Sequence, residues 1–161
     1  MADGVTSACL LTKSLAQTAL RDLGRVDRGT LRNSIFVTVT RGQDEIRGVV
    51  SADAFYAVWV EYGRLGSKSS YAGTGPQSAT AAWPNVAAIT AWVARNIEKL
   101  RAGSGGRETS VESLAFLVGR KIAERGIRPT PFMRPAEAQV RPRFKPIVLD
   151  AVLKRRASLG V

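Results

Sequence analysis

The sequence predicts an α+β protein with an N-terminal helix, a small antiparallel sheet of about three or more strands, and three further helices, of which the last is long. Three observations predict this fold. Apolar residues recur at helical spacing near the N-terminus, two β-rich segments flank a short turn, and three amphipathic segments fill the second half of the chain. Hydrophobic residues make up 45% of the 161 residues, which is enough for the core of a single domain over residues 1–161.

The first helix is predicted over residues 7–23. Thr6 or Ser7 is suited to cap its N-terminus, and Gly24 is suited to end it, because glycine accepts the left-handed conformation found after a helix. Its apolar stripe has the spacing of one helix face and consists of Ala8, Leu11, Leu15, Ala19 and Leu23.

A β-hairpin is predicted after a turn at Gly29 and a short helical turn over residues 30–34. Residues 34–41 and 45–51 are rich in β-branched side chains, and a turn at residues 42–44 joins them. Residues 54–62 fit either a short helix or a buried strand, because nine residues do not define a period. Their β-branched and aromatic content favours a third strand over residues 58–62.

The second half of the chain alternates loops and helices. Residues 64–82 are rich in Gly, Ser, Thr and Ala and predict a long flexible loop. A helix is predicted from Pro84 to about residue 100, and residues 101–107 form a flexible linker. The next helix is predicted over residues 111–125, capped by Ser110 or Thr109 and ended by Gly126.

The last helix is predicted over residues 136–158, opened by Pro135. Pro142 and Pro146 predict either a kink in it or a start nearer Pro142, because proline lacks the amide donor of a helix interior. A basic C-terminal tail follows over residues 154–161.

The charge and the rare residues restrict the function. Lys and Arg total 24 against 13 acids, a formal net charge of +11, which favours contact with a polyanion such as nucleic acid. The chain has no histidine and one cysteine, Cys9, which excludes histidine-dependent triads, typical zinc sites and an intrachain disulfide. Cys9 is expected to be a small packed side chain. We expect no enzyme activity, no cofactor and no metal.

Neither a membrane span nor a secretory signal is predicted. No run approaches the roughly 20 apolar residues that a spanning helix needs, and the polar N-terminus carries Asp3. A soluble protein of the producing cell's cytoplasm is therefore expected. Residues 73–76 and 103–106 are glycine-rich but lack the ending and context of a phosphate-binding loop, so both are interpreted as linkers.

Three short strings stand in a fixed order along the chain. They read VDRGTLRNSI at residues 26–35, FYAVWVEYG at residues 55–63 and RPTPFMRPA at residues 128–136. Together they resemble a tailed-bacteriophage family of small neck and tail-completion proteins, whose members carry patterns like D-T-G-x-L-R-x-S-I, Y-A-x-Y-V-E-x-G-T and P-F-x-R-P-A. Arg28 and Arg64 depart from these patterns, since threonine is usual at both positions.

The resemblance implies an assembly motif rather than an active site. It suggests a short helical turn over residues 54–57, and it implies that Glu61 pairs with an arginine such as Arg134 rather than acting in catalysis. The motif residues are Gly29, Leu31, Ser34, Ile35, Tyr56, Ala57, Val60, Glu61, Tyr62, Gly63, Pro131, Phe132, Arg134, Pro135 and Ala136.

As a function, the resemblance implies a structural virion protein that forms a ring, expected to be a homohexamer, in the phage neck. Its partners would be copies of itself, the head-side connector or stopper, the tail terminator or tail tube, and packaged DNA through weak non-specific contact. It would be found in the virion and, during assembly, in the host cytoplasm. Expected DNA-channel contacts are Arg141, Arg143, Lys145, Lys154, Arg155 and Arg156.

Two alternatives stay open. A tail terminator that caps the tail tube shares the size, the α+β build and the ring symmetry of a neck protein. A small basic protein that binds DNA without sequence preference is supported by the net charge of +11.

Overall fold

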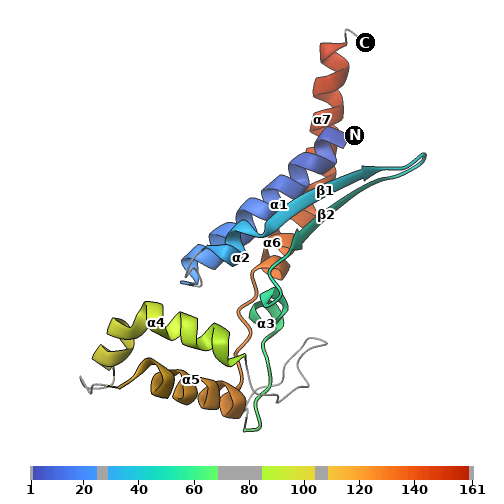
Figure 1. Ribbon diagram of the computed structural model, residues 1–161. Coiled ribbons are helices and arrows are strands. Elements are labelled where there is room, and N and C mark those ends of the chain that lie inside the picture. Colours follow the sequence, from blue (N-terminus) through green and yellow to red (C-terminus); the bar gives the residue numbers. More distant parts are fainter. Residues whose placement is uncertain (1, 25–28, 69–84, 104–108, 160–161) are drawn as a thin grey trace. The chain divides into compact units, whose positions relative to one another are not determined.

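The computed structural model describes residues 2–24, 29–68, 85–103 and 109–159, and the chain divides into two units (Figure 1). The first unit combines Met1–Ala57 with Thr130–Val161, and the second is Val58–Pro129. The α+β class is confirmed, with an N-terminal helix, an antiparallel sheet and a long C-terminal helical segment. The expectation of one domain stays a prediction, and each unit is described by itself.

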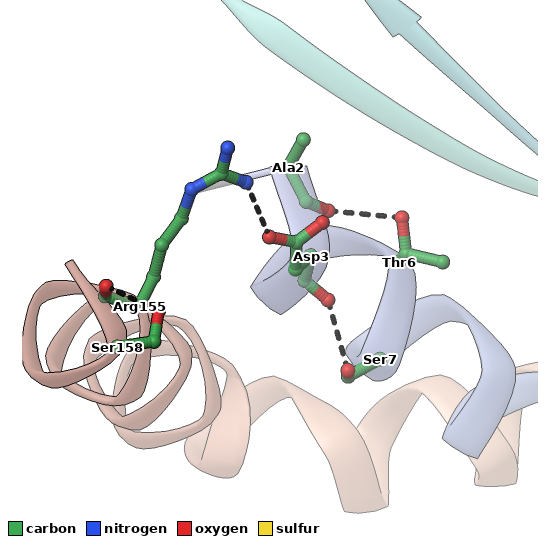
Figure 2. A network of polar contacts seen from close by, with 6 residues as sticks. All are labelled: Ala2, Asp3, Thr6, Ser7, Arg155 and Ser158. Atoms are coloured by element: carbon green, nitrogen blue, oxygen red, sulfur yellow. Dashed lines mark hydrogen bonds and ion pairs between the residues drawn. The ribbon is translucent and has the colours of Figure 1, made fainter.

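Helix α1 spans Ala2–Asp22 and begins earlier than predicted. Thr6 and Ser7 are therefore not its cap. Their hydroxyls lie inside the helix and donate to the carbonyls of Ala2 and Asp3, at 2.9 and 2.8 Å (Figure 2). A hydroxyl that bonds back to the carbonyl four residues earlier is compatible with a helix interior, so the capping signal was misleading here.

One face of α1 forms the core of the first unit. The helix packs against α6 (Met133–Val140), α7 (Phe144–Ser158) and both strands of the sheet, as Figure 1 shows. Of the predicted stripe, Ala8 is buried, Leu11, Leu15 and Ala19 are half-buried, and Leu23 is exposed. The buried residues of α1 are mostly small, and they are Ala2, Gly4, Val5, Ala8, Cys9, Ala16 and Leu20.

The predicted hairpin is confirmed. Strand β1 (Ile35–Arg41) pairs antiparallel with β2 (Ile46–Ala52), from Ile35 opposite Ala52 to Arg41 opposite Ile46. The amide of Gly42 donates to the carbonyl of Glu45 at 2.8 Å and closes the turn. The short helical turn before β1 is also confirmed, as α2 over Thr30–Asn33.

The predicted third strand is wrong. Residues 57–62 form helix α3 (Ala57–Tyr62), and among the described residues the sheet has only two strands. The buried residues of this segment are Ala57 and Glu61, which are four apart and therefore share one helix face. The expected helical turn before it is present, since the amide of Ala57 donates to the carbonyl of Ala54 at 2.8 Å.

The second unit contains the helical pair α4 (Val86–Gly103) and α5 (Val111–Arg125), which lie side by side in Figure 1. Ser110 caps α5 by accepting a hydrogen bond from the Ser113 amide at 3.2 Å, as predicted. Before α4, the Asn85 side chain accepts from the amide of Ala88. The core of the pair consists of Val93, Leu114 and Ala115, flanked by Ile89, Ile97, Leu100, Val111 and Val118.

The last helical segment is interrupted where prolines predicted a kink. Helix α6 (Met133–Val140) passes into a 3-10 turn, η1 (Arg141–Arg143), and then into α7 (Phe144–Ser158). Pro142 lies in the 3-10 turn and Pro146 in the first turn of α7, where a missing amide donor costs little. The segment begins at Met133, so Pro135 lies inside its first turn rather than before it.

Several expectations fall partly outside the described residues. Of the expected loop, residues 64–68 are described and residues 69–82 are not; Pro84 also lies outside. Of the expected linker, residues 101–103 form the end of α4, and residues 104–107 lie outside the described residues. Of the two glycine-rich segments, residues 73–76 and 104–106 also lie outside the described residues. Residues 154–158 of the expected tail belong to α7.

Candidate functional site

The first motif forms the entry to the sheet. Gly29 has a φ of 75°, a left-handed conformation that favours glycine, and it precedes α2. Leu31 and Ile35 are buried in the core. These residues therefore fix where the hairpin leaves α2.

Ser34 connects the first motif to the residues before the second. Its hydroxyl donates to the carbonyl of Leu31 at 2.9 Å and accepts from the amide of Ala54 at 3.2 Å. Its carbonyl accepts from the amide of Asp53 at 3.2 Å. One serine thus holds the start of β1 beside the chain that leaves β2, a link that the sequence spacing did not reveal.

The second motif spans the boundary between the units. Tyr56 and Ala57 lie in the first unit, and the Tyr56 ring packs edge-on against Phe55 with centroids 5.3 Å apart. Val60, Glu61, Tyr62 and Gly63 lie in the second unit. Val60 and Tyr62 are half-buried, and Glu61 is only 4% exposed.

Gly63 ends α3 in a left-handed conformation, with a φ of 77°. Its amide donates to the carbonyl of Trp59 at 2.9 Å. A Cβ here would lie 2.8 Å from the carbonyl oxygen of Ile127 and from Pro129, so the segment after α3 passes too close for any other residue. Glycine at the end of the motif therefore has a specific backbone role.

Arg64, which departs from the family pattern, is built into the second unit. It is 7% exposed, and its guanidinium carbon lies 5.6 Å from the centre of the Trp59 ring, within range of a cation–π contact. Its backbone pairs with Ile127 through two hydrogen bonds of 2.8 Å. Apart from the position of Arg64 after Gly63, no sequence signal indicated this role.

The third motif starts the last helical segment. Phe132 is 1% exposed and Ala136 is equally buried, so the Phe132 ring anchors this segment in the core. Pro131 is half-buried just before it, and Pro135 is exposed in the first turn of α6. Arg134 is exposed and, with Cys9 and Glu137, lines an open hollow of about 470 Å³ within the first unit.

The pairing of Glu61 with Arg134 stays a prediction. Glu61 lies in the second unit and Arg134 in the first. The two units are each described by themselves.

The basic residues expected to face DNA are all exposed, but several are paired with acids. Arg141 contacts Glu137 at 3.1 Å, and Lys154 contacts Asp150 at 2.8 Å. Arg155 reaches across to Asp3 at the start of α1, at 2.9 Å, as Figure 2 shows. Since successive helix residues point about 100° apart, Lys154, Arg155 and Arg156 spread around α7 rather than forming one surface. Arg143 and Lys145 are exposed at the start of α7.

Cys9 is buried against the sheet, as expected for a small packed side chain. Burial raises the pKa of its thiol, which keeps it protonated near neutral pH.

Within residues 2–24, 29–68, 85–103 and 109–159, no group of three His, Cys, Asp or Glu side chains is placed to hold a metal ion. No helix of this part of the chain is long and apolar enough to cross a bilayer.

The comparisons with known proteins identify one family. Residues 11–63 match the family model described as "Bacteriophage HK97-gp10, putative tail-component". The match covers about a third of the chain and includes the whole first motif and the whole second motif. The resemblance to a family of phage tail components is thereby confirmed over this segment. No curated protein and no solved structure matches the chain.

Proposed function

We propose that this chain is a structural virion protein of a tailed phage, or of a related prophage, that forms a ring in the neck. The ring joins the head connector to the tail and lets DNA pass. The observation that carries this proposal is the ordered set of three motifs, two of which fall inside the segment that matches a phage tail-component family.

The exposed apolar surface of the first unit supports assembly into a ring. Phe55 is 71% exposed, and Leu149 and Leu153 are more than half exposed on α7. Single exposed apolar residues are ordinary, but Leu149 and Leu153 are four residues apart and share one face of α7, which favours contact with another chain. In a ring, each copy presents one surface to the next copy and a different surface to the previous one, and the ring closes when the rotation between neighbours divides a full turn.

The two-stranded sheet also favours assembly. A hairpin of two strands is marginally stable alone and needs packing on at least one face. Here α1 covers one face, whereas the other face exposes Phe36 and Val49. We propose that neighbouring copies in the ring, expected to be a homohexamer, or the adjacent neck proteins cover this second face.

The test is electron microscopy of lysates from phage that lack the gene for this chain. We expect filled heads beside separate tails of normal length, because a missing neck ring prevents joining, and we expect the gene supplied in trans to restore complete particles. Overlong tail tubes would instead support a tail terminator, since an uncapped tube continues to grow. Complete infectious particles without the chain would contradict both roles and favour the small DNA-binding protein.

A further inference from the structure

Four cations gather at the end of α5, on a different element from the helix expected to face DNA. They line a hollow of about 570 Å³ within the second unit, with Val118, Ile122 and Gly126 between them. Among the described residues that line it there is no carboxylate. The four cations are Lys68, Lys121, Arg125 and Arg128.

The acid that precedes Arg125 in the sequence, Glu124, is engaged by another cation. Its Oε1 lies 3.1 Å from the Nε of Arg120. This hydrogen bond and the charge of Lys68 keep the pKa of Glu124 below its usual range, so it is ionised and held by a fifth basic residue.

The cations are not needed to cap α5. Basic residues often gather at a helix C-terminus because they offset its partial negative charge. Here backbone amides already satisfy three of the last four carbonyls. Gly126 donates to Ile122 at 2.8 Å, Ser67 to Ala123 at 2.9 Å and Lys68 to Glu124 at 2.7 Å. The negative end of the helix is therefore covered by backbone donors, and capping does not account for the cluster.

The backbone holds Lys68 beside the other cations although they are far apart in the sequence. Two hydrogen bonds between Arg64 and Ile127 fix the start of this segment against the chain after α5. Gly66 makes the approach possible, since a Cβ there would collide with the amide of Gly126 and lie 2.6 Å from the carbonyl of Glu124. The cluster is thus built by the fold.

We infer that this basic cluster, Lys68, Lys121, Arg125 and Arg128, is a binding surface for the phosphate backbone of DNA. Duplex DNA carries one negative charge for about every 1.7 Å of its axis, so several cations around one hollow can contact more than one phosphate. Basic residues outnumber acidic ones in both units, which favours an extended polyanion over a small acidic patch on a protein. The inference rests on the proposed function only in naming packaged DNA as the ligand.

The test compares two variants of the full chain that lose the same charge at different places. The cluster variant carries Lys68→Gln, Lys121→Gln, Arg125→Gln and Arg128→Gln. The matched variant carries Arg21→Gln, Arg41→Gln, Arg47→Gln and Lys99→Gln, at four exposed positions outside the cluster and outside the residues expected to face DNA. Binding to a labelled random-sequence duplex is measured by fluorescence anisotropy at several salt concentrations, with circular dichroism to verify folding.

We expect the cluster variant to bind the duplex at least about tenfold more weakly than the wild type. The slope of log K for DNA binding against log salt concentration should become shallower by about one for each phosphate that the variant no longer contacts. The matched variant should bind less than about threefold more weakly than the wild type. Equal losses would overturn the inference, because they would show that net charge alone decides. Polyglutamate that competes as well as DNA would also overturn it, in favour of an acidic protein partner.

A charge-conserving variant keeps the test valid if glutamine disturbs folding. Lys68→Arg, Lys121→Arg, Arg125→Lys and Arg128→Lys should together retain binding within about threefold, because phosphate contact depends mainly on charge. A loss as large as that of the glutamine variant would overturn the inference. This outcome is separate from that of the proposed function. A chain that is present in the neck but does not bind DNA would contradict only this inference. A chain that binds DNA but is absent from virions would contradict only the proposed role in the neck.

Discussion

Phe132 is the largest side chain that the described structure buries almost completely, at 1% exposure. It stands directly before α6, so its ring fixes the point at which the last helical segment leaves the core. The surrounding Pro131 and Pro135 restrict the backbone on both sides. The third motif therefore acts through packing and backbone direction.

We expect Phe132→Ala to lower the free energy of unfolding by about 3–5 kcal/mol, because it removes a buried aromatic ring and leaves a cavity. Urea denaturation followed by circular dichroism measures this loss. Phe36→Ala is the control, since Phe36 is 44% exposed on the outer face of the sheet. It should cost about 1 kcal/mol or less. Phe132→Leu keeps the comparison measurable if the alanine variant does not fold, and equal costs at both positions would contradict the anchoring role.

At the residue scale, the sequence predicted burial better than hydrogen bonding. Leu31, Ile35, Phe132 and Cys9 are buried as their apolar contexts indicate. The link from Ser34 to Ala54 was not predictable, because it depends on the hairpin register that brings the residues before β1 and after β2 together. Capping of α1 by Thr6 or Ser7 was wrong for a similar reason: both residue types also bond inside helices.

At the scale of elements, a close contact in the first unit joins α1 and α7 through Gly4. A Cβ at Gly4 would lie 2.6 Å from the Cα of Val148, so the two backbones approach more closely than any larger residue permits. The ion pair between Asp3 and Arg155 spans the same two helices (Figure 2). The position of the last helix against α1 thus depends on a glycine at one place.

Gly4→Ala should destabilise the chain although alanine is the better helix former. In an unpacked helix interior the change would stabilise by roughly 0.5–1 kcal/mol. Here the added methyl overpacks the contact with α7, and we expect a loss of about 1–3 kcal/mol, measured as a lower midpoint in urea. Ser14→Ala, on the exposed side of α1, is the matched control and should not destabilise. A Gly4→Ala chain more stable than the wild type would show that α1 and α7 are not in close contact.

The hairpin and α5 were predicted well, and α3 was not. The hairpin and α5 lie within about one residue of their predicted bounds, because alternation, glycine turns and a serine cap mark them. For α3 the β-branched residues favoured a strand, yet the segment is a helix with Ala57 and Glu61 on its buried face. Local β propensity is weak, and over so few residues packing outweighs it.

At the scale of the whole molecule, net charge predicts the kind of partner but not the surface that would meet it. The charge of +11 favoured a polyanion, and the basic end of the chain was the natural place to look for contact. The fold instead gathers four cations around one hollow in the second unit, by bringing Lys68 beside the end of α5. The cluster could not be predicted from the sequence, because its residues are far apart along the chain and the pairing of Arg64 with Ile127 brings them together.

The central claim is the place of this chain in the particle, and a cryo-electron microscopy reconstruction of the neck of purified virions tests it most directly. We expect a closed ring of copies of this chain between the head-side connector and the tail tube, with the fold of the first unit recognisable in each copy. Particles in which the chain is absent, or in which it occupies a site away from the junction of head and tail, would contradict it.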